Sequence, residues 1–342
     1  MLSNSTLQQI LYIEWGSEIL LGIPSFFINI YTALRMSQLA TFNINLKFVL
    51  CATSLSAAIL SFLHPTIQAV PRSEYLVENK RYKFICFMYF LQYISHSLNL
   101  MANLKFLVIA IERKVAFNRR RFYEHTHETF GKWLTIWMLL FCFVIVALKV
   151  LFFLFLPYKQ TLDDRLRDGF FLEGNLYYYI FAYMVVGICY GYGIYEFNSL
   201  KQHAKLVRFT GNSLSERYEI KQTRDVVIVM RTLLKAFGLL YGLANIVLLV
   251  QIYFYFRYEQ TENTLFYHAM ANIAFILIHI YNLFFATYML WYFQPMRRMI
   301  LGDLFSLCGV RERFPRIVPI GMEQTQDQHF HSLTSVWEKS AV

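Results

Sequence analysis

Residues 84–123 read FICFMYFLQYISHSLNLMANLKFLVIAIERKVAFNRRRFY. The first part, from Phe84 to Ile111, is long and apolar enough to cross a bilayer as a helix, which takes about 20 residues. It ends at Glu112-Arg113-Lys114 and continues into a basic segment that ends at Tyr123. We therefore expect one helix that leads from a membrane interior to a charged surface in water, with an acid–base pair where the lipid ends.

The composition of the whole chain agrees with a membrane protein. The 342 residues are 57% hydrophobic and 16% charged, whereas soluble domains carry about 25% charged residues. Aromatic residues make up 18%, which is typical of helices that face lipid and place rings at the membrane interfaces. The net charge of +10 comes from basic residues between apolar stretches. We therefore expect these residues to face membrane lipids, and we expect no nucleic-acid partner.

The cysteines and the N-terminus add two exclusions. Four of the five cysteines lie inside apolar runs, and an odd number in such positions does not form a disulfide framework. The first positive charge, Arg35, follows the first apolar run, so there is no pattern of a cleavable signal peptide. We expect that first run to remain as a membrane anchor.

Seven apolar segments of roughly 20 residues or more match the length of membrane-spanning helices. They run from about Ile10 to Leu34, Phe48 to Val70, Phe84 to Ile111, Leu134 to Leu156, Tyr177 to Phe197, Leu233 to Phe256 and Phe266 to Phe293. Strands of membrane barrels are about 10 residues long and strictly alternating, which these segments are not. The sequence predicts an all-α, seven-transmembrane helix bundle, residues 1–293, followed by a cytoplasmic segment, residues 294–342.

The distribution of lysine and arginine favours an N-terminus outside the cell. With that orientation the inner loops and tail hold 20 of these residues and the outer loops hold eight, and cytoplasmic loops are normally the more positive. Asn4-Ser5-Thr6 is a glycosylation sequon in the segment that would lie outside. Asn4 is therefore a candidate glycosylation site.

The segment after the seventh apolar run, from Gln294 to Phe305, reads QPMRRMILGDLF. Its early proline, apolar residues and arginine pair predict a short amphipathic helix along the inner leaflet. Cys308 follows it and is a candidate palmitoylation site, with an unmodified cysteine as the alternative. We expect the polar remainder of the tail to be disordered.

Polar residues inside three of the segments recur every three or four residues, the spacing of one helix face. Because polar groups are costly in lipid, we expect these faces to point into the bundle. The stripes are Gln92, His96, Asn99 and Asn103 in the third segment, His268, Asn272, His279 and Asn282 in the seventh, and Glu14, Glu18, Ser25 and Asn29 in the first. They predict a partly polar cavity.

We expect a small-molecule pocket in the outer half of this cavity. Its candidate ligand-binding residues are Glu18, Gln92, His96, Tyr183, His268 and Asn272. The alternative is that each group only hydrogen-bonds a neighbouring helix. Lys149, in the fourth segment, either extends outward or acts as a counter-ion for Glu18 or for an acidic ligand.

Motifs of enzyme chemistry are absent from the sequence. His125-Thr126-His127 and His329-Phe330-His331 lack nearby acids or cysteines that would complete a metal site. There is no nucleophile elbow, no phosphate-binding glycine loop and no suitably spaced pair of carboxylates. The sequence predicts no enzyme activity, no catalytic residue, no metal and no cofactor.

Two motifs resemble those of the nematode serpentine chemoreceptors, in particular the Sra superfamily and its class epsilon (Sre) group. The first is IAIERKVA at residues 109–116, followed by Phe122-Tyr123-Glu124, and is similar to the family's "ER..A" then "YE" pattern. The second is LSERYE at residues 214–219, similar to "LS.RYQ..EN". The chain departs from this pattern with Glu219 in place of Gln and Gln222-Thr223 in place of Glu-Asn.

The resemblance implies a G-protein-coupled chemosensory receptor in the plasma membrane of sensory neurons, in their cilia. It implies that Arg113 pairs with Glu112 at rest and turns toward a heterotrimeric G protein when the sixth helix swings outward. The residues that the resemblance assigns to the switch or to G-protein contact are Glu112, Arg113, Tyr123, Arg217 and Tyr218.

Other classes of membrane protein fit the sequence less well. A ligand-gated channel of the insect chemoreceptor kind has its N-terminus inside, against which the charge distribution argues. A small-molecule transporter predicts repeats with broken helices in matching halves, and the sequence shows no such pairing. The second outer loop, residues 157–176, has no cysteine to pair with Cys86, so detailed rules from rhodopsin-type receptors do not transfer.

Overall fold

The computed structural model describes residues 4–39, 42–120, 129–155, 161–171, 175–207, 214–257 and 264–307. Within these ranges every long element is an α-helix, and seven helices are long and apolar enough to cross a membrane. They are α1 (Asn4–Gln38), α2 (Ile44–Gln68), α3 (Tyr82–Asn118), α5 (Phe130–Phe155), α7 (Leu176–Leu206), α8 (Leu214–Arg257) and α9 (Thr264–Tyr292). The prediction of an all-α seven-helix bundle is confirmed.

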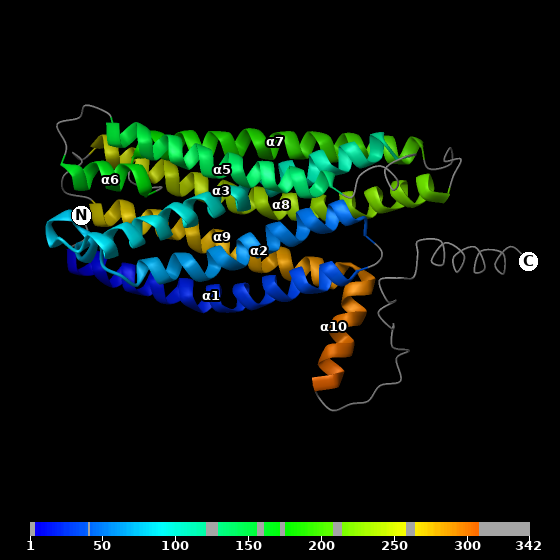
Figure 1. Cartoon of the computed structure of the whole chain (residues 1–342), viewed down its shortest axis with the longest axis horizontal. Coiled ribbons are helices and arrows are strands. Elements are labelled where there is room, and N and C mark those ends of the chain that lie inside the picture. Colours follow the sequence, from blue (N-terminus) through cyan, green and yellow to red (C-terminus); the bar gives the residue numbers. More distant parts are fainter. Residues whose placement is uncertain are drawn as a thin grey trace, which may run out of the picture. The chain divides into compact units, whose positions relative to one another are not determined.

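The helix that opened the sequence analysis, α3, is central in the bundle. It packs against α2, α5, α7 and α8, while α1 packs against α2 and α9. In the most apolar window of α3, 78% of the residues are buried, against 22% for α7 and for α8. Figure 1 shows the helices side by side along one long direction, with α1 and α7 on opposite sides. The polar face of α3 is therefore enclosed by protein.

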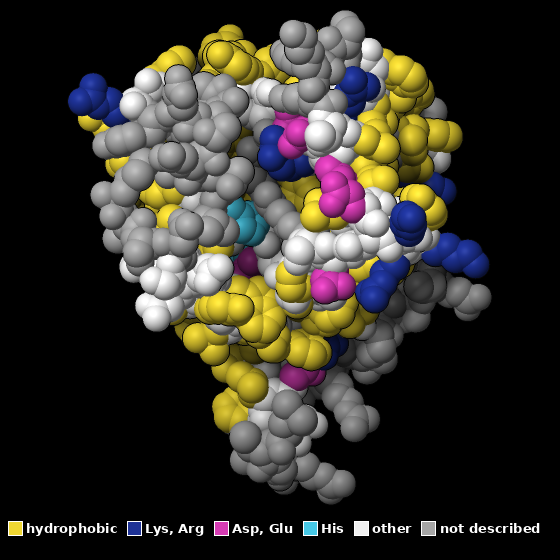
Figure 2. Space-filling view, turned by 90° about the vertical axis from the view of Figure 1, so that its left-hand side faces the viewer, with side chains coloured by type: hydrophobic (Ala, Val, Ile, Leu, Met, Phe, Trp, Pro, Cys, Tyr) yellow, Lys and Arg dark blue, Asp and Glu magenta, His cyan; other side chains and the backbone are white. Residues whose placement is uncertain are grey.

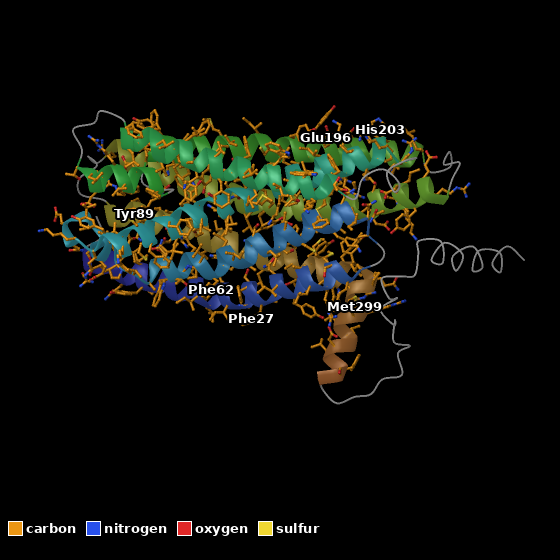
Figure 3. All side chains as sticks on the ribbon, in the orientation of Figure 1. Phe27, Phe62, Tyr89, Glu196, His203 and Met299 are labelled. Carbon is orange, nitrogen blue, oxygen red and sulfur yellow. The ribbon has the colours of Figure 1, made fainter. Side chains whose placement is uncertain are left out.

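The outward faces of the bundle are apolar. Leu20 on α1, Phe155 on α5 and Ile188 on α7 are 75%, 80% and 73% exposed. Phe27 lies on the outer side of α1 (Figure 3), and Phe62 on α2 is also exposed. Soluble monomers rarely expose apolar surface of this extent. Because helices satisfy their own backbone hydrogen bonds, they are suited to contact lipid there. The bundle has the surface of a multi-pass membrane protein.

The helices extend further than the apolar segments. α8 has 44 residues and begins at Leu214, whereas the sequence suggested a span only from about Leu233. At 1.5 Å per residue it is about 66 Å long, roughly twice the thickness of a bilayer core. Hydropathy marks only the part of a helix that contacts lipid, so its polar N-terminal turns were not recognised as helical.

The connection between α5 and α7 contains a short helix that the sequence analysis did not predict, α6 (Leu162–Phe170). Thr161 caps its N-terminus by accepting a hydrogen bond from the amide of Asp164, a typical N-cap arrangement. The loop between α2 and α3 forms two short 3-10 helices, η1 (Arg72–Tyr75) and η2 (Val77–Asn79). The amide of Val77 donates to Oδ1 of Asp163 over 2.9 Å, so the two loops are joined.

Aromatic packing reinforces this joint between the loops. The rings of Tyr75 and Phe171 are nearly parallel, with centroids 6.2 Å apart, and Tyr89 contacts both rings. Cys86 is a free, exposed cysteine. The α2–α3 and α5–α7 connections are thus held together by packing and a hydrogen bond, and Cys86 forms no disulfide with them within the described residues.

The second compact unit begins at Gln294. Its described part is the helix α10 (Gln294–Leu307), with Pro295 in its first turn. The predicted helix in this segment is therefore present, while its contact with a membrane stays a prediction. Cys308 and the rest of the tail lie outside the described residues.

Candidate functional site

Four helices of the bundle, α3, α7, α8 and α9, enclose a pocket with a volume of about 80 Å³. This is space for several water molecules or a small organic ligand. Most of the wall is aromatic or aliphatic, and a few polar groups are set into it, as is typical of small-molecule sites. The polar residues of the wall are His96, Asn99, Asn103, Tyr178, Tyr179, Tyr183, Tyr241, Tyr281 and Asn282.

Tyrosine hydroxyls connect the two helices on one side of the pocket. The hydroxyl of Tyr241 on α8 donates to the backbone oxygen of Tyr183 on α7 over 2.7 Å. The hydroxyls of Tyr183 and Tyr179 lie 3.2 Å apart. Tyr190 on α7 donates in turn to the backbone oxygen of Leu234 on α8 over 3.1 Å. The relative position of α7 and α8 is therefore coupled to the side chains that line the pocket.

Asn282 on α9 is a polar residue of the pocket wall, and the nitrogen of its side-chain amide has no hydrogen-bond acceptor among the described residues. Its Oδ1 accepts a hydrogen bond from Nζ of the buried Lys105 over 3.0 Å. Its Nδ2 is buried and has no acceptor among the described residues. Burying an unused amide donor is costly, and a ligand or water oxygen in the pocket would satisfy it.

The pocket includes two of the six predicted ligand-binding residues, His96 and Tyr183. The other four, Glu18, Gln92, His268 and Asn272, do not line it. On α9 the lining begins at Ala274, and on α3 it begins at His96, one turn beyond Gln92. The pocket therefore lies about one helical turn, roughly 5 Å, deeper than the sequence suggested.

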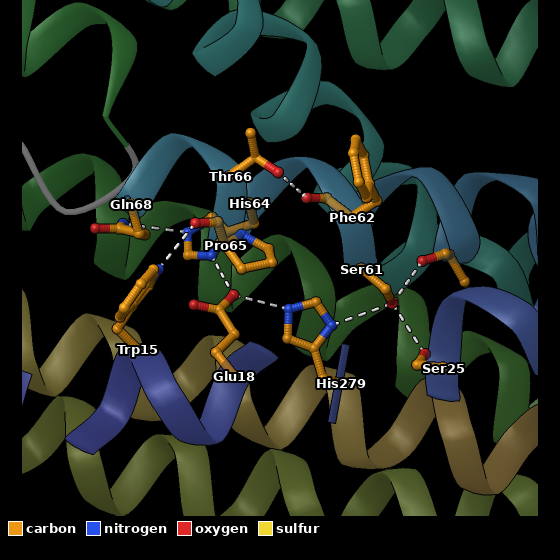
Figure 4. Close-up of polar contacts among 11 residues, drawn as sticks. Trp15, Glu18, Ser25, Ser61, Phe62, His64, Pro65, Thr66, Gln68 and His279 are labelled. Carbon is orange, nitrogen blue, oxygen red and sulfur yellow. Dashed lines mark hydrogen bonds and ion pairs between the residues drawn. The ribbon is translucent and has the colours of Figure 1, made fainter. Parts of the chain in front are cut away.

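Glu18 belongs to a different cluster, between α1, α2 and α9 (Figure 4). Its Oε1 atom contacts Nδ1 of His64 and lies 2.9 Å from Nε2 of His279. All three side chains are at most 1% exposed. The ring of His64 stacks on Phe275, with centroids 3.6 Å apart, and Phe275 lines the pocket. One aromatic ring thus contacts both the cluster and the pocket.

One turn before Glu18, the carboxylate of Glu14 is buried on the same face of α1. It accepts a hydrogen bond from the side chain of Asn272 on α9, and its Oε2 atom has no partner within the described residues.

Seen from the end of the bundle that carries α6, the surface is hollowed, and a histidine and an acidic side chain are visible in the hollow (Figure 2).

The acid–base pair of α3 is completely buried at the other end of the helix. The guanidinium of Arg113 donates from Nε and Nη2 to the two carboxylate oxygens of Glu112, over 2.5 and 2.6 Å. Its Nη1 lies 3.8 Å from Oε2 of Glu219 on α8. Both Arg113 and Glu219 are 0% exposed. An acid–base pair at an ordinary lipid boundary would contact water, whereas Glu112 and Arg113 are fully buried.

Further ion pairs tie α3 to its neighbours at this end. Nζ of Lys114 lies 2.5 Å from the carboxylate of Glu196 on α7, and Nε of Arg120 lies 2.6 Å from that of Glu216 on α8. Figure 3 shows Glu196 and His203 toward the end of α7 that is remote from α6. Asn43, before α2, also donates to Glu219, over 3.2 Å. These contacts thus join α3 to α7 and α8, and join α8 to the residue before α2.

Four residues were predicted to contact a G protein or to carry a glycan, and their positions do not test these roles. Arg217 is exposed on α8, and Tyr218 beside it is half-buried. Asn4 is the first residue of α1. Tyr123 lies outside the described residues. Their proposed roles in G-protein contact and glycosylation stay predictions.

Lys149 contacts a backbone oxygen and an aromatic ring rather than Glu18, and its pairing with an acidic ligand stays a prediction. Its Nζ atom donates to the backbone oxygen of Phe171 over 2.5 Å and lies 4.2 Å from the ring centre of Tyr178. The side chain is buried. It therefore anchors the segment after α6, and it is not a counter-ion for Glu18.

No family model matches the chain, and no curated protein matches it. The fold and the sites by themselves define the class, a seven-helix membrane bundle with an interior pocket and two buried charged clusters. This description fits a membrane receptor or a transporter.

Several residues of these sites were not singled out in the sequence. These residues are His64, Lys105, Glu196 and Glu219, none of which was predicted as a site residue. Ionisable residues inside membrane helices are rare and usually functional. That rule, applied to single residues, would have identified His64 and Lys105.

Proposed function

We propose that the protein is a receptor that binds a small molecule in the interior pocket and signals through the Arg113 end of the bundle to a heterotrimeric G protein. The observation that carries the proposal is that the same two helices serve both sites. α3 contributes His96 to the pocket and Arg113 to the buried cluster. α8 contributes Tyr241 to the pocket and Glu219 to the cluster.

This arrangement supports a two-state switch. A ligand that displaces α8 at Tyr241 would change the distance between Glu219 and Arg113, since both groups lie on rigid helices. A ligand shifts such an equilibrium only by its differential affinity for the two states. The resemblance to nematode serpentine chemoreceptors of the Sra superfamily supports the same assignment, with a plasma-membrane location in sensory neurons and their cilia.

The test measures coupling without a known ligand. The chain is expressed with an energy-transfer sensor of G-protein dissociation, and basal signalling is compared with that of Arg113→Ala at equal surface expression. We expect Arg113→Ala to abolish basal coupling. Equal basal signals from both proteins, both above that of empty cells, would contradict the role of Arg113.

The orientation is tested separately. An epitope before α1 should be stained on intact cells, with Asn4→Gln as the control for glycosylation. Staining only after permeabilisation would place the N-terminus inside and favour a channel of the insect chemoreceptor kind.

A transporter is the second candidate, because Glu18, His64 and Lys105 are ionisable groups buried within the spans. Such groups mark ion or proton pathways in many membrane proteins. A substrate-dependent current or uptake in cells that lack G-protein subunits would favour this function over the receptor.

A further inference from the structure

We infer that Glu18, His64 and His279 form a binding site for a divalent transition-metal ion, with Zn²⁺ as the best match. One nitrogen from each histidine and one carboxylate oxygen converge, and the three atoms lie within 4.8 Å of one another. The inference does not depend on signalling, and it concerns a cluster separate from the residues that line the pocket.

The hydrogen bonds around His279 leave an electron pair facing the carboxylate. The hydroxyl of Ser61 has one proton, and its neighbour at 2.8 Å, the backbone oxygen of Ala57, can only accept it. The Ser61 oxygen can then accept both from the hydroxyl of Ser25, 2.9 Å away, and from Nδ1 of His279, 3.2 Å away. Neutral His279 with its proton on Nδ1 fits these partners, and its Nε2 then presents a lone pair to the carboxylate of Glu18 at 2.9 Å.

Two electron-pair donors this close require a cation between them or beside them. A proton on Nε2 would be such a cation, but it would create a fully buried imidazolium. A metal ion is the alternative cation, and Ser61 would then be the partner that orients the ligating histidine. The carboxylate also faces Nδ1 of His64, so a third ligand is already in place.

The ligand set is one that Zn²⁺ uses. Two imidazoles and one carboxylate bind zinc in sites that leave a fourth position open for water. Ligand atoms about 2.1 Å from the ion lie roughly 3.4 Å apart in a tetrahedron. Both contacts of the Glu18 carboxylate are shorter than this, so it must move away from the two histidines by roughly 0.5–1 Å. His64 must also shift its remaining proton to Nε2, where Gln68 is 3.5 Å away and can rotate its amide to accept it.

A fourth group is available near the site. The unpartnered Oε2 of Glu14 lies one turn along α1 from Glu18 and would accept a hydrogen bond from a metal-bound water. A bound ion would fasten α1, α2 and α9 together. Because Phe275 stacks on His64 and lines the pocket, it would also fix one wall of the pocket.

The full chain, purified in detergent through a tag without histidine and stripped with EDTA, is titrated with Co²⁺. We expect visible absorption bands of a low-coordinate Co²⁺ site that saturate at one ion per chain and are displaced by Zn²⁺. Glu18→Gln, His64→Ala and His279→Ala should weaken binding by at least about 100-fold, because loss of an outer-shell partner alone costs about 10–100-fold. His203→Ala, on the exposed surface of α7, should bind as the unaltered chain does.

Each variant is first shown to be monodisperse and to melt cooperatively in EDTA. Glu18→Gln is nearly isosteric, so it decides the question if a histidine variant does not fold. Absence of stoichiometric Co²⁺ or Zn²⁺ binding with the metal in excess over the chain would overturn the proposal and leave a proton as the shared cation. Equal loss of binding in His203→Ala would also overturn it.

Discussion

Nζ of Lys105 on α3 donates a hydrogen bond to Oδ1 of Asn282 on α9 over 3.0 Å. The ring centres of Tyr281 and Phe285 lie 4.3 and 4.5 Å from the same nitrogen. Among the described residues no carboxylate pairs with this buried ammonium. An amide oxygen and two aromatic faces therefore stabilise the charge, next to the wall of the pocket.

The two members of this contact should respond differently to mutation. Asn282→Leu leaves the charge of Lys105 buried without its acceptor, which costs about 1–3 kcal/mol. Lys105→Met removes the charge together with its desolvation cost, so we expect a smaller loss of stability. Apparent melting temperatures in detergent measure both effects. The double variant should be more stable than Asn282→Leu alone, and a melting temperature of Asn282→Leu at or above that of Lys105→Met would contradict this account.

The contact between α1 and α2 depends on a glycine. A Cβ atom at Gly22 would lie 2.6 Å from the backbone oxygen of Ser61, so Gly22→Ala must push the helices apart. Overpacking of this kind typically costs about 1–3 kcal/mol, and we expect a lower melting temperature. Gly16→Ala on the same helix is the matched control, because nothing lies within 4 Å of a Cβ there. It should leave stability unchanged or raise it, since alanine favours helix by about 1 kcal/mol.

The fold could be predicted from the sequence because each span is marked by its own apolar length. The N-terminal turns of α8 and the helix α6 could not, since those residues are largely polar and hydropathy marks only apolar spans. The inward faces were also predictable: His96 and Asn103 share a stripe and line the pocket.

The partners of these faces were not predictable. Glu18 was grouped with His96 because both point inward, yet it contacts His64 and His279. Which inward groups meet depends on how the helices rotate and pack, and spacing along one helix carries no information on this. Glu219 and Glu196 illustrate the same limit, since each completes an ion pair with a residue more than 80 positions away.

Stability near α6 should depend on pH through Asp168. Burial raises the pKa of its carboxyl above the usual value, although Arg167 and Lys149 partly oppose this. A raised pKa means that the charged form is disfavoured in the folded state, so stability falls as pH rises through that pKa. Asp168→Asn should therefore slow amide hydrogen exchange in residues 162–171 at pH 7.5, after correction for intrinsic rates, and the difference should vanish near pH 4. Slower exchange of equal size at both pH values would exclude this cause.

Glu219 should hold the bundle in its resting state. Its carboxylate lies 3.8 Å from Nη1 of Arg113 and also accepts from Asn43, so Glu219→Gln weakens the tie between α3 and α8 without a change of shape. A loss of about 1 kcal/mol shifts a two-state equilibrium about fivefold, and we expect basal G-protein signalling to rise by that order at equal surface expression. Lys221→Ala, two residues along α8 and exposed, is the control and should leave the basal signal unchanged. If Glu219→Gln signals at the level of the unaltered chain while Arg113→Ala is silent, Arg113 contacts the G protein directly and Glu219 is no part of the switch.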